Sequence, residues 1–135
     1  MGTVVCEEPG EAVRKRMMTI LLIDDEESVR MLFQMALAQA GYRVLTAESG
    51  SHGLRILQHQ EVDLALVDIF MPEMDGLELI PLLRTTRPSS KIIAMSGGSW
   101  EWDYLDTAKQ LGADDTLKKP FSLQALLDAV SSQLN

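Results

Sequence analysis

The sequence "DLALVD" at residues 63–68 decides the fold, because it is a short apolar run that ends in a carboxylate. Two further runs share this form, "TILLID" at residues 19–24 and "KIIAMS" at residues 91–96. Together they are rich in Ile, Leu and Val, which is typical of strands buried on both faces of a parallel sheet. Two weaker strands are predicted nearer the edges, "YRVLTA" at residues 42–47 and "DDTLKK" at residues 114–119.

Helical patterns lie between these predicted strands. Apolar residues recur with helical spacing over residues 29–40, and Gly41 is predicted to end that helix. A second regular stripe covers residues 123–134, with Ser122 as its predicted N-cap. Less regular helices are predicted at residues 54–58, 77–84 and 103–111. Pro81 is expected to kink or delay the second of these three.

The alternation of strands and helices predicts five β-α units in one α/β domain at residues 19–135. Such units form a parallel sheet with helices on both faces. Residues 1–18 contain Pro9, Gly10 and many charges without clear periodicity, so we predict a flexible N-terminal extension, with a short amphipathic helix as the alternative.

Composition limits the partners. The net charge of −8 argues against nucleic acid or an anionic membrane as the main partner, since both need clustered Lys and Arg. The single cysteine, Cys6, fits a reducing compartment. No apolar run approaches the roughly 18 residues of a membrane span, and the N-terminus lacks the apolar core of a signal peptide. A cytoplasmic domain is therefore expected.

Polar residues follow four of the five predicted strands, namely Asp24 and Asp25, then Asp68, then Ser96, then Lys119. The carboxyl ends of parallel strands meet at one edge, where ligands bind in open sheets. Carboxylates placed close together favour a divalent cation, and oxygen ligands suit Mg²⁺. A lysine and a hydroxyl beside them can stabilise a phosphoryl group that a carboxylate accepts.

Each of these residues also has an ordinary structural explanation when taken alone. Asp24 and Asp25 could be acids at a helix start, and Asp68 could belong to a turn. Ser96 could lie in a plain glycine loop, and Lys119 carries no signal without its place after a strand. Only their joint order favours a site over these explanations. The Asp-Gly pair at residues 75–76 is predicted to be structural, a turn before a helix.

The combined pattern resembles the receiver domain of two-component response regulators, from residue 19 to about residue 134. The resemblance implies a flavodoxin-like (βα)5 fold, a doubly wound parallel sheet with strand order 2-1-3-4-5. It implies that a sensor histidine kinase or phosphotransfer protein donates a phosphoryl group to Asp68 in a Mg²⁺-dependent reaction. The protein would relay the signal by conformational change, and would catalyse only its own phosphorylation and slow autodephosphorylation.

The resemblance also implies the metal ligands. Asp24 and Asp25 match the acidic pair that places Mg²⁺, with Asp25 the more direct ligand. Asp68 and the backbone carbonyl of Phe70 would complete the protein ligands.

Ser96 and Lys119 match two further residues of the family. The Ser96 hydroxyl would move toward the phosphoryl group, and Lys119 would pair with the transferred oxygens. The bond between Lys119 and Pro120 is expected to be cis.

Three positions depart from the family pattern. The switch position on the fifth strand is usually aromatic, but here it is Thr116, so activation is expected to use a different readout. Phe70 stands where many members have a polar residue near the attacking water, and Gly98 has no side chain to position water. These two residues predict slow autodephosphorylation. Gly97 follows Ser96 where a small residue such as alanine is common, which makes the loop permissive.

Trp100, Trp102 and Tyr104 cluster after that loop. They are expected either to pack locally or to form a surface around the fourth helix for a partner or a homodimer. No output domain follows the helix at the end of the sequence, so we expect the effector to be a separate protein, or the chain to be a fragment of a longer one. Two other functions stay open, an Mg²⁺-dependent phosphohydrolase with an aspartyl nucleophile and a pseudo-receiver that only binds partners.

Overall fold

The computed structural model describes residues 16–71, 74–97 and 102–135. Within them, five parallel strands form one sheet in the order β3-β2-β4-β5-β6, which confirms the predicted order and the edge positions of the two weaker strands. The strands are β2 (Thr19–Ile23), β3 (Arg43–Ala47), β4 (Leu64–Asp68), β5 (Lys91–Gly97) and β6 (Asp115–Lys119). The helices are α2 (Glu27–Gln39), α3 (Gly50–His59), α4 (Gly76–Thr86), α5 (Trp102–Leu111) and α6 (Leu123–Leu134).

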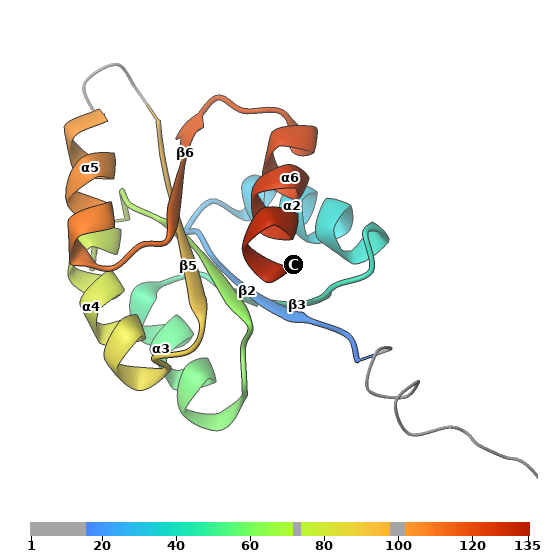
Figure 1. The fold of residues 1–135 in the computed structure, drawn as a ribbon, viewed down its shortest axis with the longest axis horizontal. Coiled ribbons are helices and arrows are strands. Elements are labelled where there is room, and N and C mark those ends of the chain that lie inside the picture. The colour runs from blue at the N-terminus through green and yellow to red at the C-terminus, as the bar shows by residue number, and fades with distance from the viewer. Residues whose placement is uncertain (1–15, 72–73, 98–101) are drawn as a thin grey trace, which may run out of the picture.

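The helices cover the sheet in two layers (Figure 1), with α3, α4 and α5 on one face and α2 and α6 on the other. Because side chains alternate along a strand, β2 sends Leu21 and Ile23 into the first core and Ile20 and Leu22 into the second. Every residue of β2 and β4 is buried. This double burial explains why these strands appear in the sequence as continuous apolar runs.

Three helix ends behave largely as the sequence predicts. Gly41 adopts a φ of 102° just after α2, and the Ser122 hydroxyl accepts a hydrogen bond from the Ala125 N–H at 3.0 Å. Asp75 caps α4 by accepting from the Glu78 N–H at 2.9 Å. The helix therefore begins ahead of Pro81, so this proline does not delay it, and the other predicted effect, a kink, stays a prediction.

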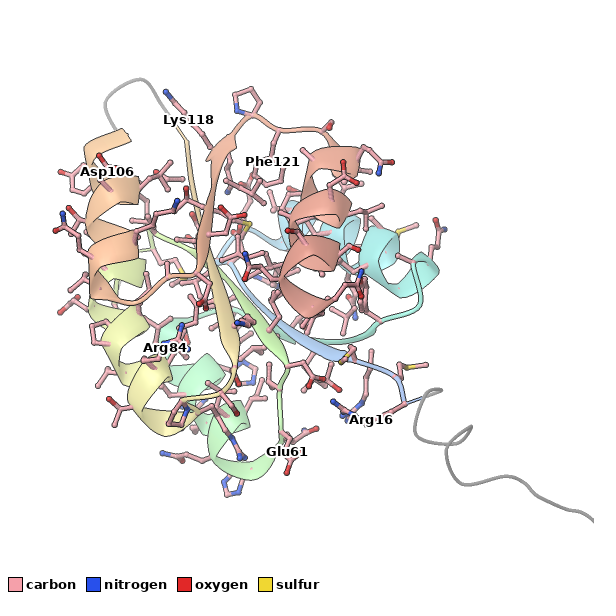
Figure 2. The ribbon with its side chains drawn as sticks, viewed as in Figure 1. Arg16, Glu61, Arg84, Asp106, Lys118 and Phe121 are labelled. Atoms are coloured by element: carbon pink, nitrogen blue, oxygen red, sulfur yellow. The ribbon has the colours of Figure 1, made fainter. Side chains whose placement is uncertain are left out.

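Arg84 of α4 links several segments at the edge of the sheet where the strands begin (Figure 2). Its guanidinium donates to the carbonyl oxygens of Ser90 and Gly112 at 2.7 and 2.6 Å, and to the Asp114 carboxylate at 2.7 Å. A further bond reaches the Pro88 carbonyl at 3.0 Å. One side chain thus ties α4 to the chain before β5 and to the chain before β6.

Residues 16–18 of the predicted extension are described, and they are attached to the domain. The Asp63 carboxylate accepts from Arg16 at 2.8 Å and from the Thr19 N–H at 2.7 Å, which fixes the chain where it enters β2. The prediction of flexibility for residues 1–15 lies outside the described residues. Among the helices of the described ranges, none is long and apolar enough to cross a membrane.

Candidate functional site

Three carboxylates meet where β2 and β4 end. Asp24 is fully buried, Asp68 is 7% exposed and Asp25 is exposed to solvent. One carboxylate oxygen from each lies within 4.8 Å of the others. The structure therefore brings together the acidic residues that the sequence singles out. Three convergent carboxylate oxygens, one of them from an exposed residue, match the oxygen ligands that Mg²⁺ prefers.

Backbone contacts hold Asp24 in place. Its Oδ1 atom accepts from the Glu26 N–H at 2.9 Å, and its N–H donates to the Ala47 carbonyl at 3.2 Å. Arg30, one turn into α2, donates to the Asp24 carbonyl at 2.7 Å. The second oxygen, Oδ2, stays free of these contacts and faces Lys119. Sequence reasoning missed Arg30, since a lone arginine on a helix gives no signal of this contact.

Gly76 fixes the chain that leaves Asp68. Its N–H donates to the Ile69 carbonyl at 2.7 Å, which brings the start of α4 against the end of β4. A Cβ atom at this position would lie 2.7 Å from the Ile69 Cα and 2.8 Å from the Asp68 carbonyl oxygen. Only glycine fits so close to the backbone. The predicted structural role of the Asp-Gly pair is confirmed, and it bears directly on the placement of Asp68.

Lys119 reaches the carboxylates from the end of β6. Its Nζ atom lies 3.4 Å from Asp24 Oδ2 and 3.8 Å from Asp68 Oδ1. Gly97 lies opposite Lys119 in the β5–β6 pair, and a Cβ there would stand 3.2 Å from the Lys119 Cβ. The glycine after Ser96 therefore leaves room for the lysine stem. The predicted cis bond between Lys119 and Pro120 is confirmed.

Ser96 occupies the end of β5, one residue beyond the Met95 that pairs with Asp68. Its side chain is fully buried, and its hydroxyl has no hydrogen-bond partner within the described part of the chain. Thr116 lies half-buried on β6, paired with Ala94. A threonine side chain is too short to swing as an aromatic ring does. Thr116 therefore differs from the usual aromatic switch residue in the structure as well as in the sequence.

The pKa of Asp68 is raised from its ordinary value of 3.8 to about 6. Burial is the largest cause, because it disfavours the charged form, and the negative charge of Asp24 adds to it. Lys119 acts in the opposite direction, as does the backbone N–H of Phe70, which faces the carboxylate. The carboxylates of Asp24, Asp25 and Asp68 thus carry more negative charge than the Lys119 ammonium offsets. A bound cation would relieve this imbalance.

The Phe70 side chain points to solvent and is 46% exposed. Its ring meets the ring of Tyr104 on α5 edge to face, with centroids 5.3 Å apart and planes at 80°. Sequence reasoning placed Tyr104 in a cluster with the two tryptophans and missed this contact, because nothing in the local spacing connects the two residues. The predictions for Trp100 and for the Trp102 side chain lie outside what the structure describes.

The chain matches the family model described as the response regulator receiver domain over residues 20–131. It is 37% identical over 103 residues to the alkaline phosphatase synthesis transcriptional regulatory protein PhoP of Bacillus subtilis, covering 76% of this chain and 42% of that protein. It is 35% identical over 127 residues to the autoinducer 1 sensor kinase/phosphatase LuxN of Vibrio campbellii, covering 94% of this chain and 15% of that protein. The chain spans less than half the length of either relative.

Solved structures with the same fold agree with this match. A CheY-like response regulator receiver domain protein from Methanospirillum hungatei gives a TM-score of 0.83 at 28% identity, covering 88% of this chain and 94% of that one. The response regulator TrrA from Thermotoga maritima, solved in complex with Mg²⁺-BeF, gives 0.79 at 32% identity, covering 87% of this chain and all of that one, 100%.

Proposed function

This chain belongs to the response regulator receiver domain family, and on that premise we propose that it accepts a phosphoryl group on Asp68 from a phosphohistidine. The observation that carries the proposal is the convergence of three carboxylates, a lysine ammonium and an unpartnered hydroxyl at the ends of four strands. A turn or a helix start would account for any one of these groups. It would not account for all of them at one edge.

In the proposed step, a carboxylate oxygen of Asp68 attacks phosphorus and the bond from phosphorus to the imidazole nitrogen breaks. The electron pair of that bond stays on the histidine, and Asp68 becomes an acyl phosphate. Asp24, Asp25, Asp68 and the Phe70 carbonyl would hold Mg²⁺, which would supply positive charge beside the phosphoryl oxygens. Lys119, already 3.8 Å from Asp68, would pair with the same oxygens.

The Ser96 hydroxyl supports the signalling part of the proposal. A buried hydroxyl without a partner is costly, and a phosphoryl oxygen on Asp68 would offer it an acceptor. Forming this bond would draw the end of β5 inward and shift the protein between two conformations. Because Thr116 replaces the usual aromatic residue, a partner would have to detect this shift by a change other than the rotation of a ring on β6.

The partners are part of the proposal. A sensor histidine kinase or a phosphotransfer protein would be the donor, and a separate effector protein would read the shift in a stand-alone receiver. The predicted homodimer around the fourth helix and the predicted cytoplasmic location stay predictions.

The test is an intact-mass measurement after incubation with Mg²⁺ and a small acyl-phosphate donor. We expect the wild type to gain one phosphoryl group, and we expect Asp68→Asn and an EDTA-treated sample to gain none. Asp106→Asn, at an exposed aspartate of α5, is the matched control and should gain the group as the wild type does. Turnover of added phosphate esters would instead indicate a phosphohydrolase. A protein that does neither would be a pseudo-receiver, and the proposal would be wrong.

A further inference from the structure

The edge-to-face contact between Phe70 and Tyr104 joins two parts of the site that the strands do not connect directly. Phe70 lies two residues after Asp68, and its backbone N–H faces the Asp68 carboxylate and lowers the pKa of that group. Tyr104 lies in the first turn of α5, the helix that follows the Ser96 loop. The ring contact therefore joins the segment just after Asp68 to α5, the helix that follows Ser96 in the chain.

Core packing does not explain this contact. In the described part of α5, Leu105 and Ala108 are the side chains that enter the core, whereas Tyr104 is 42% exposed. Phe70 is likewise 46% exposed. Two half-exposed rings bury little apolar surface, so the main effect of the contact is to hold one ring relative to the other.

The position of the Phe70 ring bears on how long a phosphoryl group would last. In hydrolysis, a water oxygen bonds to phosphorus and the bond from phosphorus to the Asp68 oxygen breaks. The electron pair returns to the Asp68 carboxylate, the water loses a proton to solvent, and inorganic phosphate leaves. A phenyl ring two residues after the acceptor offers no hydrogen bond to orient that water, and if it were held over the phosphoryl group it would exclude water from its approach.

We propose that Tyr104 is a positioning residue, which holds the Phe70 ring beside the acceptor and thereby slows hydrolysis of phospho-Asp68. This inference rests on the proposed function, because it needs a phosphorylated Asp68. It adds Tyr104, a helix residue that is not one of the acidic, hydroxyl and lysine residues at the strand ends. It also commits to an order of action, since Tyr104 works only through Phe70.

The experiment measures the lifetime of the phosphorylated protein by intact mass after the acyl-phosphate donor has been removed by desalting. Tyr104→Leu keeps bulk but removes the ring, and we expect it to lose the phosphoryl group about two- to tenfold faster than the wild type, as expected from the strength of one aromatic pair. Tyr104→Phe keeps the ring and should restore the wild-type lifetime. Leu111→Ala, at an exposed apolar residue near the other end of α5, should leave it unchanged.

A double variant tests the order of action. Phe70→Ala should shorten the lifetime by itself, and adding Tyr104→Leu should shorten it no further. Equal lifetimes for the wild type and Tyr104→Leu would overturn the inference while leaving the proposed function intact. The inference would also be overturned if the double variant lost the phosphoryl group faster than Phe70→Ala, by the factor that Tyr104→Leu shows alone. If the wild type gains no phosphoryl group at all, the proposed function fails and this inference fails with it.

Discussion

Replacing Asp68 by asparagine is expected to stabilise the metal-free protein. Burial and the neighbouring Asp24 raise the pKa of Asp68 from 3.8 to about 6, so its charge is unfavourable in the folded chain at neutral pH. Asparagine has nearly the same shape and hydrogen-bonding groups as the neutral acid but no charge to desolvate. The substitution therefore removes the cost and keeps the packing.

The magnitude follows from the two pKa values. At 1.36 kcal/mol per pH unit, raising the pKa from 3.8 to about 6 makes ionisation about 3 kcal/mol less favourable in the folded protein than in the unfolded one. Above about pH 6 both forms are ionised and the full penalty is present. As pH falls from about 6 to 3.8, the folded protein takes up the proton first, so the penalty shrinks and then disappears.

Urea unfolding in EDTA gives the measurement. The free energy of unfolding of Asp68→Asn should exceed that of the wild type by about 3 kcal/mol near pH 7.5, and by much less near pH 4.5. Taking the difference between variants cancels the titration of the other carboxylates. Asp106→Asn should stay within about 0.5 kcal/mol of the wild type at both pH values. A variant less stable than the wild type at neutral pH, or a gap that does not change with pH, would refute this account of Asp68.

Three further substitutions test the surroundings of the site. Asp25→Asn should leave the metal-free stability within about 0.5 kcal/mol of the wild type, because Asp25 is exposed, but should reduce the rise in melting temperature that Mg²⁺ produces in a thermal shift assay. Gly76→Ala should cost about 2–4 kcal/mol in urea unfolding, because its Cβ would stand 2.7 Å from the Ile69 Cα, and an unchanged midpoint would contradict the close approach. Arg84→Met should cost about 2–3 kcal/mol in urea unfolding, since it leaves the Ser90 and Gly112 carbonyls without this donor and leaves the Asp114 carboxylate with the Ile92 N–H at 2.8 Å. Arg55→Met, at an exposed arginine of α3, should cost under about 0.5 kcal/mol.

The sequence predicts the sheet well because its signal is strong and local. A parallel strand covered on both faces must be apolar throughout, so runs such as "DLALVD" stand out, and the strand-helix alternation then fixes the architecture. The site residues could be predicted to converge for a related reason, since strand ends in such a sheet share one edge. Their predicted roles came from the order in which the acids, the hydroxyl and the lysine occur along the chain.

Contacts that depend on tertiary packing could not be predicted in this way. The Phe70–Tyr104 pair joins residues that α4 and β5 separate along the chain, and the residues next to each of them give no sign of the contact. The α3 helix begins at Gly50, earlier than its apolar spacing suggests, because Ser49 caps it by accepting from the His52 N–H at 3.2 Å. His52 on the same helix is half-buried, and its Nδ1 atom is buried without a partner among the described residues, which the helical spacing alone does not indicate.

The contacts of Arg84 tie α4 to the chain before β5 and before β6 at one edge of the sheet. At the edge where the strands begin, sliding α4 past the neighbouring chain would break several guanidinium bonds at once. At the opposite edge, among the residues described, one ring contact joins the segment after β4 to α5. We therefore expect α5 to move more, relative to α4, at the edge that carries Asp68 than near the Arg84 guanidinium. Amide hydrogen exchange should show this gradient, slow near Gly112 and faster toward the first turn of α5.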